Sequence, residues 1–366
     1  MLTVVKIGSS SVVDQKGHPN GELINHLCRQ INDLRNQGHA IVLVSSGAVA
    51  LGSTIIKNLK TDSKDDIAAK QALAAVGQFE LMSAYNKEFS DYETVTAQVL
   101  LTPTDFMHRR QYLTAKSTLE TLLAMNILPI INENDAVATD EIRFGDNDRI
   151  AALVANMLGA NLLVLLTDTT GMYTADPSID ENATLIKEIT DLTDQINKMA
   201  SETSSSYGSG GMVAKLAAAK IASWSGVKVV IGSAGNPTLL TDAVGEKSVD
   251  ATVIHPKSEK LAARKLWIAF AKANHGTVVI DDGAVTAIVE LNKSLLPNGV
   301  TECRGEFVPG EAIEVLSSTQ ELIAKGLSKM SSQELAEFAK RKSLGETYTV
   351  TTELIHRDDL VLLAGN

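Results

Sequence analysis

The sequence predicts an α/β protein, a three-layer αβα sandwich around a mainly parallel sheet, followed by a small C-terminal β-barrel domain. As far as Pro256, short apolar runs alternate with helical patterns, which is typical of a parallel sheet covered on both faces. Beyond Pro256 the runs become short strands separated by turn residues, which indicates a compact β module. We therefore predict a first domain over residues 1–256, a connecting helix over 257–274 and a β-barrel domain over 275–366.

Six apolar runs of the first domain have the length and composition of buried strands. They are Leu2–Gly8, Ala40–Val44, Thr94–Leu101, Ile127–Asn132, Leu162–Thr167 and Val227–Gly232. Between the first two, Ile24, Leu27, Ile31 and Leu34 recur at helical spacing, and Gly38 is placed to end that helix. Ligands of parallel sheets bind beyond the carboxyl ends of the strands, so we expect a site among the residues that follow these runs.

The β module is predicted to contain short strands and one helix. The strands are Thr277–Ile280, Ala287–Leu291, Ala312–Leu316, Tyr348–Thr352 and Leu360–Leu363. The helix, Ser332–Lys342, opens with Ser-Ser-Gln-Glu, which is a capping sequence. From His275 onward the chain has eight lysines and arginines against fourteen aspartates and glutamates, a net charge of −6. Because phosphate contacts dominate RNA affinity, this charge argues against RNA binding.

The overall composition indicates a soluble cytoplasmic protein. The 366 residues carry a formal net charge of −11, which argues against a general nucleic-acid or membrane-surface role. Cys28 and Cys303 lie far apart, so we expect both to be reduced thiols. No signal peptide is indicated, and no apolar run approaches the ~18 residues of a membrane span.

Several well-known catalytic motifs are absent from the sequence. There is no G-x-x-x-x-G-K-[ST] phosphate loop and no protein-kinase H-R-D or D-F-G set. The histidines form no H-x-x-x-H or Cys/His group, which argues against a zinc site, and no protein ligands for a metal are predicted.

Two clusters combine a lysine with glycines, a pattern that suits phosphate. Lys6-Ile7-Gly8 ends the first strand, where an ammonium group and a glycine turn can hold a phosphoryl group. Residues 209–215, Ser-Gly-Gly-Met-Val-Ala-Lys, open a helix whose N-terminus favours negative charge. Each cluster also has an ordinary interpretation, as a common strand lysine or as a flexible loop with a surface lysine.

Three further clusters of small polar residues follow strands. Ser45-Ser46-Gly47-Ala48, taken alone, favours an ordinary strand-to-helix turn with a serine cap. Residues 132–136, Asn-Glu-Asn-Asp-Ala, are followed across a predicted hairpin (136–144) by Gly-Asp-Asn-Asp at 145–148. Short polar side chains are costly to bury without partners, so these two runs suggest acceptors for an ammonium group and amide donors for carboxylates. The third cluster, residues 167–177, follows the strongly apolar run Leu162–Leu166.

Taken together and in this order, the clusters resemble the amino-acid kinase family. The matching stretches are Val4–Ser10, Val44–Ala48, Ile131–Val137, Gly145–Asp148, Leu166–Asp168, Tyr173–Pro177 and Gly210–Lys215. From His275 onward, including His356-Arg357-Asp358-Asp359, the chain resembles the PUA module. The resemblance covers nearly the whole chain and implies the amino-acid kinase fold. The run Asn132–Val137 is similar to that of members that phosphorylate the γ-carboxylate of L-glutamate, the first step of proline biosynthesis.

The resemblance implies a role for each matching position. Lys6 and Lys215 would contact the transferring phosphoryl group, and Asp148 would hold both lysines in place. The substrate-binding positions would be Ser46, Gly47, Asn134, Asp135 and Asn147. The nucleotide-binding positions would be Lys6, Gly8, Thr167, Asp168, Ser209, Gly210, Gly211, Met212, Val213, Ala214 and Lys215. Val213-Ala214 stands where Ser-Thr is more usual, which removes two hydroxyls near the phosphates and leaves the backbone contacts.

The resemblance also implies ATP and Mg²⁺ as cofactors, proline as an inhibitor and a homo-oligomer, either a dimer or a tetramer. Near alternatives are aspartokinase, which would show Lys-Phe-Gly-Gly-Thr-Ser and ACT modules, and acetylglutamate kinase or UMP kinase, which lack a C-terminal barrel. Outside enzymes, an RNA-binding PUA protein with a regulatory kinase-like domain and a regulatory pseudokinase are the alternatives. The intact catalytic positions argue against the pseudokinase.

Overall fold

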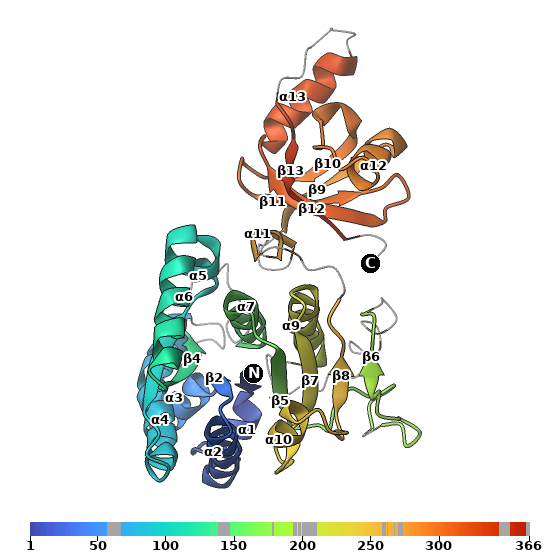
Figure 1. Ribbon diagram of the computed structural model, residues 1–366. Helices are drawn as coiled ribbons and strands as arrows, with labels where there is room; N and C mark the ends of the chain where they lie inside the picture. The colour runs from blue at the N-terminus through green and yellow to red at the C-terminus, as the bar shows by residue number, and fades with distance from the viewer. Residues whose placement is uncertain are drawn as a thin grey trace. The chain divides into compact units, whose positions relative to one another are not determined.

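The computed structural model divides into two compact units, Met1–Lys260 and Leu261–Asn366. It describes residues 1–56, 67–137, 147–177, 179–192, 196, 199, 211–257, 261, 263–266, 268, 269, 274–343 and 352–363. Each unit has its own sheet (Figure 1) and its own hydrophobic core.

The first unit is built on a mainly parallel sheet, which confirms the predicted fold class. Its described strands are β1 (Leu2–Ile7), β2 (Ala40–Ser45), β3 (Thr96–Leu101), β4 (Leu128–Glu133), β5 (Leu162–Thr167), β6 (Glu188–Ile189), β7 (Lys228–Ser233) and β8 (Thr252–Ile254). Their order is β3-β4-β2-β1-β5-β7-β8-β6, and among these neighbours only β7 and β8 run antiparallel. The predicted strands match β1, β2, β3, β4, β5 and β7 to within two residues at each end.

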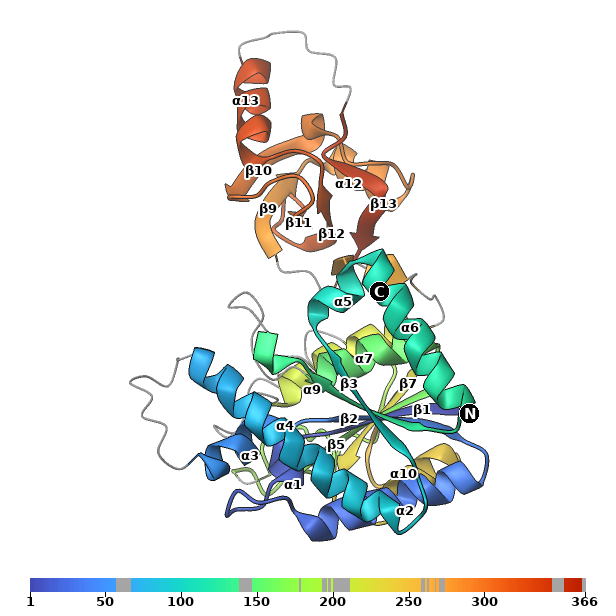
Figure 2. The ribbon, with the colours of Figure 1, turned by 90° about the vertical axis from the view of Figure 1, so that its left-hand side faces the viewer.

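Helices cover both faces of this sheet, as Figure 2 shows. The described helices are α1 (Ser9–Val12), α2 (Gly21–Asn36), α3 (Ala48–Ile55), α4 (Ile67–Ser90), α5 (Pro103–Met107), α6 (Arg109–Ala124), η1 (Asp135–Val137), α7 (Asn147–Leu158), α9 (Met212–Trp224) and α10 (Leu239–Val244). One face is covered by α2, α4 and α10, and the other by α6, α7 and α9. The described residues therefore form the three layers of the predicted sandwich.

The alternation of side chains along β1 decides where its lysine points. Val5 and Ile7 belong to the hydrophobic core that β1 shares with α2, α4 and α10. Successive side chains of a strand point to opposite faces, so Lys6 points to the face covered by α7 and α9. Strand β1 thus places Lys6 on the face of the sheet that α7 and α9 cover, near the N-termini of those two helices.

Two glycines bring α3 and α4 into close contact. A Cβ atom at Gly77 would overlap the carbonyl oxygen of Ala48 and lie 2.5 Å from the backbone nitrogen of Gly52. A Cβ atom at Gly52 would in turn overlap the carbonyl oxygen of Leu73. The two backbones touch at these points, and this contact fixes the register of α4 beside the turn that follows β2.

Replacing Gly77 by alanine is expected to lower the free energy of unfolding by about 1–3 kcal/mol, because the added methyl group forces the two helix backbones apart. Urea unfolding followed by circular dichroism measures the change. Gly21→Ala is the matched control, because a Cβ atom there meets no atom of the described residues within 4 Å. Equal stability of the two variants would contradict the close contact.

The second unit holds a five-stranded mixed sheet, within the described residues, that matches the predicted β module. Its elements are α11 (Ala263–Leu266), β9 (Asn274–Ile280), α12 (Asp282–Val289), η3 (Pro297–Gly299), β10 (Val300–Gly305), β11 (Ala312–Leu316), β12 (Leu322–Ser328), α13 (Ser332–Ser343) and β13 (Ile355–Leu362). The strand order is β10-β9-β11-β12-β13. The predicted strands at 277–280, 312–316 and 360–363 and the predicted helix at 332–342 overlap β9, β11, β13 and α13.

One predicted strand of this unit is wrong. Ala287–Leu291 was expected to be extended, but residues 287–289 lie in α12. The cause is the start of that helix, where the side chain of Asp281 accepts a hydrogen bond from the backbone nitrogen of Ala284 at 2.8 Å. This cap outweighs the β preference of the short apolar run. Most of the predicted strand Tyr348–Thr352 lies outside the described residues.

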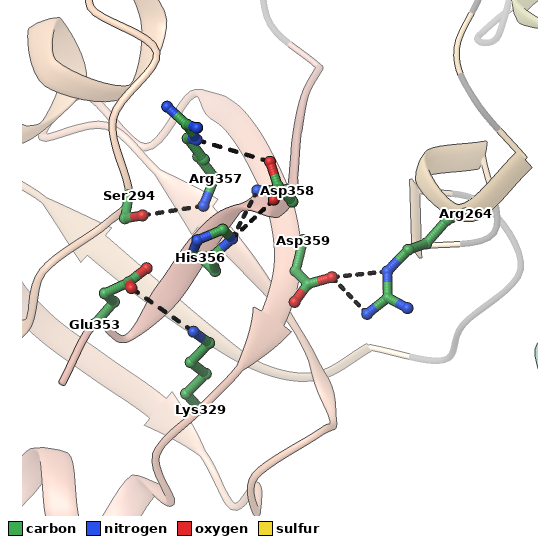
Figure 3. A network of polar contacts seen from close by, with 8 residues as sticks. All are labelled: Arg264, Ser294, Lys329, Glu353, His356, Arg357, Asp358 and Asp359. Carbon is green, nitrogen blue, oxygen red and sulfur yellow. Dashed lines mark hydrogen bonds and ion pairs between the residues drawn. The ribbon is translucent and has the colours of Figure 1, made fainter.

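Polar contacts attach neighbouring segments to β13 (Figure 3). Asp359 Oδ1 accepts hydrogen bonds from Arg264 Nε at 2.8 Å and from Arg264 Nη2 at 2.6 Å, which ties α11 to this strand. The backbone nitrogen of Arg357 donates to Ser294 Oγ at 3.1 Å. Helix α11 is therefore packed on the second sheet, and it lies in the segment that was predicted to connect the domains.

Candidate active site

The predicted site residues gather where four neighbouring strands end. Gly8 follows β1, Ser46 and Gly47 follow β2, Asn134 and Asp135 follow β4, Thr167 ends β5, and Asp168 follows it. Asn147 and Asp148 form the first turn of α7, and Met212, Val213, Ala214 and Lys215 open α9 after Gly211. The parallel strands bring their carboxyl ends to one edge of the sheet. Ser209, Gly210 and the predicted hairpin beyond Val137 lie outside the described residues.

A single buried carboxylate lies between two ammonium groups. Lys6 Nζ is 2.6 Å from Asp148 Oδ1, and Lys215 Nζ is 3.5 Å from Asp148 Oδ2. The exposed fractions of Lys6, Asp148 and Lys215 are 3%, 1% and 6%. The Lys6 contact is an ion pair by distance without the angles of a hydrogen bond. The cluster has two positive charges and one negative charge in a place that water hardly reaches.

The electrostatics of this cluster favour an incoming anion. Burial is the main cause that lowers the pKa of Lys215, and the charge of Lys6 lowers it further. Asp148, and more weakly Asp168, act in the opposite direction. A phosphoryl group placed beside both lysines would balance the remaining positive charge, and charge-assisted contacts of this kind are strong in a dry site.

Amide side chains form a second network beside the lysines. Asn147 Nδ2 donates to Ser46 Oγ at 3.1 Å and to Asn132 Oδ1 at 2.9 Å. Asn147 Oδ1 accepts from the backbone nitrogen of Glu133 at 3.1 Å. All four residues are buried. The amide of Asn147 therefore links the ends of β2 and β4 at the start of α7.

Asp135 places a carboxylate near this network without a partner for one of its oxygens. Its side chain is 7% exposed, and Oδ1 has no hydrogen-bond partner among the described residues. Burial raises the pKa of Asp135 from its ordinary value of 3.8 to about 6. A buried, unpaired carboxylate oxygen is costly in the free protein, and an ammonium group or another donor would relieve that cost.

Two helices at the site, α3 and α9, each begin directly after a glycine. Gly47 has a φ of +115°, a conformation that L side chains rarely adopt, and it begins α3 directly after Ser46. Gly211 precedes α9, and a Cβ atom there would meet no atom of the described residues within 4 Å. The N-terminus of α9, next to Lys215, favours a negatively charged ligand.

Two residues of the network were not predicted to belong to the site. Asn132 belongs to the polar run at 132–136, but the sequence does not predict its buried contact with Asn147. Gln78 lies in the middle of α4, and its Oε1 accepts a hydrogen bond from Asn132 Nδ2 at 2.7 Å. A polar residue beside a glycine in a helix, Gly77-Gln78, is the signal that could have marked it.

The described part of the chain contains no group of three or more histidine, cysteine, aspartate or glutamate side chains that could hold a metal ion. Both oxygens of Asp148 face lysines, and Asp168 Oδ1 accepts from Thr167 Oγ1 at 2.9 Å. These residues do not form a cage for a divalent cation. None of the described helices has the length and apolar character needed to cross a membrane.

Family models match both units. The model of the amino acid kinase family matches residues 1–233, and the model of the PUA domain matches residues 276–344. Among solved structures, UMP kinase from Ureaplasma parvum is similar with a TM-score of 0.49 and 15% identity, covering 70% of this chain and 98% of that chain.

Curated relatives match almost from end to end. Glutamate 5-kinase of Dictyoglomus thermophilum is 40% identical, with 98% of this chain and 97% of the relative covered. Glutamate 5-kinase of Thermoanaerobacter sp. is 41% identical over 99% of this chain and 98% of the relative. Glutamate 5-kinase of Methylibium petroleiphilum is 44% identical over 98% and 97%. The chain therefore belongs to the amino acid kinase family and, within it, to the glutamate 5-kinases.

Proposed function

We propose that this protein transfers the γ-phosphoryl group of ATP to the γ-carboxylate of L-glutamate, giving L-glutamyl 5-phosphate and ADP in the first step of proline biosynthesis. The observation that carries the proposal is the buried Lys6–Asp148–Lys215 cluster at the end of β1. On one side of it lie the amide network and Asp135, and on the other the start of α9. The relatives named above support glutamate as the acceptor.

The chemistry of this reaction suits a site without a general base. The γ-carboxylate of glutamate is already ionised at neutral pH, so no proton has to be removed before it attacks phosphorus. Positioning and charge neutralisation then supply most of the catalysis. Lys6 and Lys215 would contact the oxygens of the transferring group, and Asp148 would keep both ammonium groups charged and in place.

Glutamate would bind on the side of β2 and β4. The free carboxylate oxygen of Asp135 is a suitable acceptor for the substrate ammonium group. The hydroxyl of Ser46 and the backbone at Gly47 are suitable donors to a substrate carboxylate. Asn147 and Asn134 would complete this side, because Asn147 bonds Ser46 and Asn134 precedes Asp135.

The nucleotide would bind on the side of β5 and α9. Gly8, Thr167 and Asp168 lie at the strand ends, and Gly211 with Met212, Val213, Ala214 and Lys215 forms the helix start. Since the described residues offer no metal cage, Mg²⁺ would be held by the ATP phosphates and water, as is usual for this ion. When bound, it would neutralise phosphate charge.

Trapping the product with hydroxylamine tests the reaction directly. Purified protein with Mg-ATP and L-glutamate is expected to yield glutamate-dependent hydroxamate and an equal amount of ADP. Aspartate, N-acetylglutamate and UMP serve as parallel acceptors. Turnover with one of these but not with glutamate would contradict the substrate, and no turnover with any of them would contradict the kinase activity.

The activity with glutamate is expected to fall in acid because of Asp135. With a pKa of about 6, Asp135 is about one-tenth ionised at pH 5, so kcat/KM for glutamate should fall about tenfold between pH 7 and pH 5. Initial rates at saturating ATP measure this. In Asp135→Asn, kcat/KM should be low throughout and lack this step. A step of equal size in the variant would assign the titration to another group.

The same residue should cost stability in the free protein. Because its folded pKa lies above the unfolded value, the native state binds more protons between pH 4 and 6, and stability falls as pH rises through that window. Asp135→Asn is therefore expected to raise the free energy of unfolding at pH 7, by at most about 3 kcal/mol. The gain should vanish near pH 4.

We further propose feedback inhibition by proline and a homo-oligomeric state in a cytoplasmic setting, where the free thiols of Cys28 and Cys303 stay reduced. Titration of proline at fixed glutamate and sedimentation test the first two. An RNA-binding role for the PUA domain is not favoured, because its region carries a net charge of −6 and its relatives are named as kinases.

A further inference from the structure

We infer that Gln78, on α4, is a positioning residue for the acceptor side of the active site. Its Oε1 accepts a hydrogen bond from Asn132 Nδ2 at 2.7 Å, and Asn132 in turn bonds Asn147. The inference rests on the proposed function in one respect, the assignment of Ser46 and Asn147 to the acceptor substrate.

Gln78 and two further contacts fix the orientation of the Asn132 amide. Asn132 Oδ1 accepts from the backbone nitrogen of Glu133 at 2.9 Å and from Asn147 Nδ2 at 2.9 Å. If the amide turned over, its NH₂ group would face these two donors. Its NH₂ group instead points to Gln78, whose Oε1 is the acceptor that makes this orientation favourable.

The orientation of Asn132 decides how Asn147 uses its own protons. Asn147 Nδ2 donates one hydrogen to Asn132 Oδ1 and the other to Ser46 Oγ. Because Ser46 Oγ accepts in this bond and finds no acceptor of its own among the described residues, its hydroxyl hydrogen is available to a ligand. The series of hydrogen bonds from Gln78 to Ser46 therefore leaves the Ser46 hydroxyl as a donor for the carboxylate of the acceptor substrate.

The packing of α4 explains why Gln78 can do this from a helix interior. The preceding residue, Gly77, lies against the backbone of Ala48 and Gly52 in α3. Helix α3 itself begins right after Ser46-Gly47. The close approach of the two helices thus fixes the position of the Gln78 backbone relative to the end of β4. From that position its side chain can contact Asn132.

Steady-state kinetics of Gln78→Leu test the inference. The substitution keeps the size of the side chain and removes the acceptor. We expect KM for glutamate to rise about tenfold, as for the loss of one well-placed hydrogen bond, while kcat changes less than threefold and KM for ATP stays the same. A purely structural role would lower the melting temperature and leave the KM for glutamate unchanged, and that result would overturn the inference.

Gln30→Leu is the matched control. Gln30, a buried glutamine of α2, likewise uses its Oε1 as an acceptor, from the backbone nitrogen of Leu240 at 3.0 Å, whereas Gln78 is half-buried. The Gln30→Leu variant should lose stability without any change in KM for glutamate. Equal KM values for the two variants would contradict a specific role of Gln78.

A double variant tests the route through Asn132. If Gln78 acts through Asn132, then Gln78→Leu should add less than twofold to the KM of Asn132→Ala, whereas independent effects would multiply. Multiplying effects would overturn the proposed route. Wild-type hydroxamate formation is measured first: if another acceptor replaces glutamate, the substrate proposal fails, and the same KM comparison with that acceptor still decides the role of Gln78.

Discussion

Asp148→Asn is expected to lower kcat by about a thousandfold and to destabilise the protein. Removing the carboxylate leaves the ammonium groups of Lys6 and Lys215 buried side by side without a counter-charge. Breaking a buried ion pair in this way costs about 3–5 kcal/mol of folding free energy. Hydroxamate formation and urea unfolding measure the two effects.

The pH profile of this variant distinguishes loss of charge from loss of shape. Asp148 raises the pKa of Lys215 against the effect of burial, so its removal should lower that pKa further. The residual activity of Asp148→Asn is then expected to decline at a lower pH than the activity of the wild type as the solution becomes more alkaline. Asp33→Asn, at an exposed position of α2, is the control and should behave as the wild type. Identical alkaline limbs in Asp148→Asn and wild type would contradict the electrostatic role.

Lys215→Met is expected to abolish most of the activity while leaving the fold intact. The loss in kcat should again be about a thousandfold, because a positive charge no longer faces the transferring group. Asp148 remains paired with Lys6 at 2.6 Å, so the buried cluster becomes a balanced pair and a desolvated ammonium group disappears. The free energy of unfolding should therefore be equal to that of the wild type or higher.

Comparison of the two substitutions separates catalysis from folding. Both should be nearly inactive, but only Asp148→Asn should be unstable. Lys247→Met, at an exposed lysine paired with Asp242, is the control for loss of a lysine and should change neither property by much. If Lys215→Met unfolds as readily as Asp148→Asn, the ion pair between Asp148 and Lys6 does not stabilise the fold as proposed.

The central sheet and the place of the site could be predicted from the sequence, since buried strands are continuous apolar runs and their carboxyl ends carry the polar clusters. The run Leu162–Thr167, for example, coincides with β5. The second sheet was harder. Strands β10 and β12 were missed because β10 is largely exposed and β12 contains Gly326, whose missing side chain makes room for Ile355.

The predicted site residues with described positions lie at one edge of the sheet, but their partners could not be read from spacing. Gln78 reaches Asn132 across 54 positions of sequence, and Asn147 reaches Ser46 across 101. Such pairs depend on how helices cross the sheet, which local patterns do not encode. The helix α12 shows the opposite problem, since there a single cap at Asp281 overrode the local preference for extended backbone.

The central place of β1 in the sheet has a consequence for the order of events in turnover. β1 lies between β2 and β5, so the residues proposed for glutamate and those proposed for ATP come from opposite sides of one strand. Each substrate can then enter without displacing the other, and both must be present before phosphorus moves. The layout favours a ternary complex and direct transfer, with intersecting double-reciprocal plots and no phosphorylated form of the protein along the way.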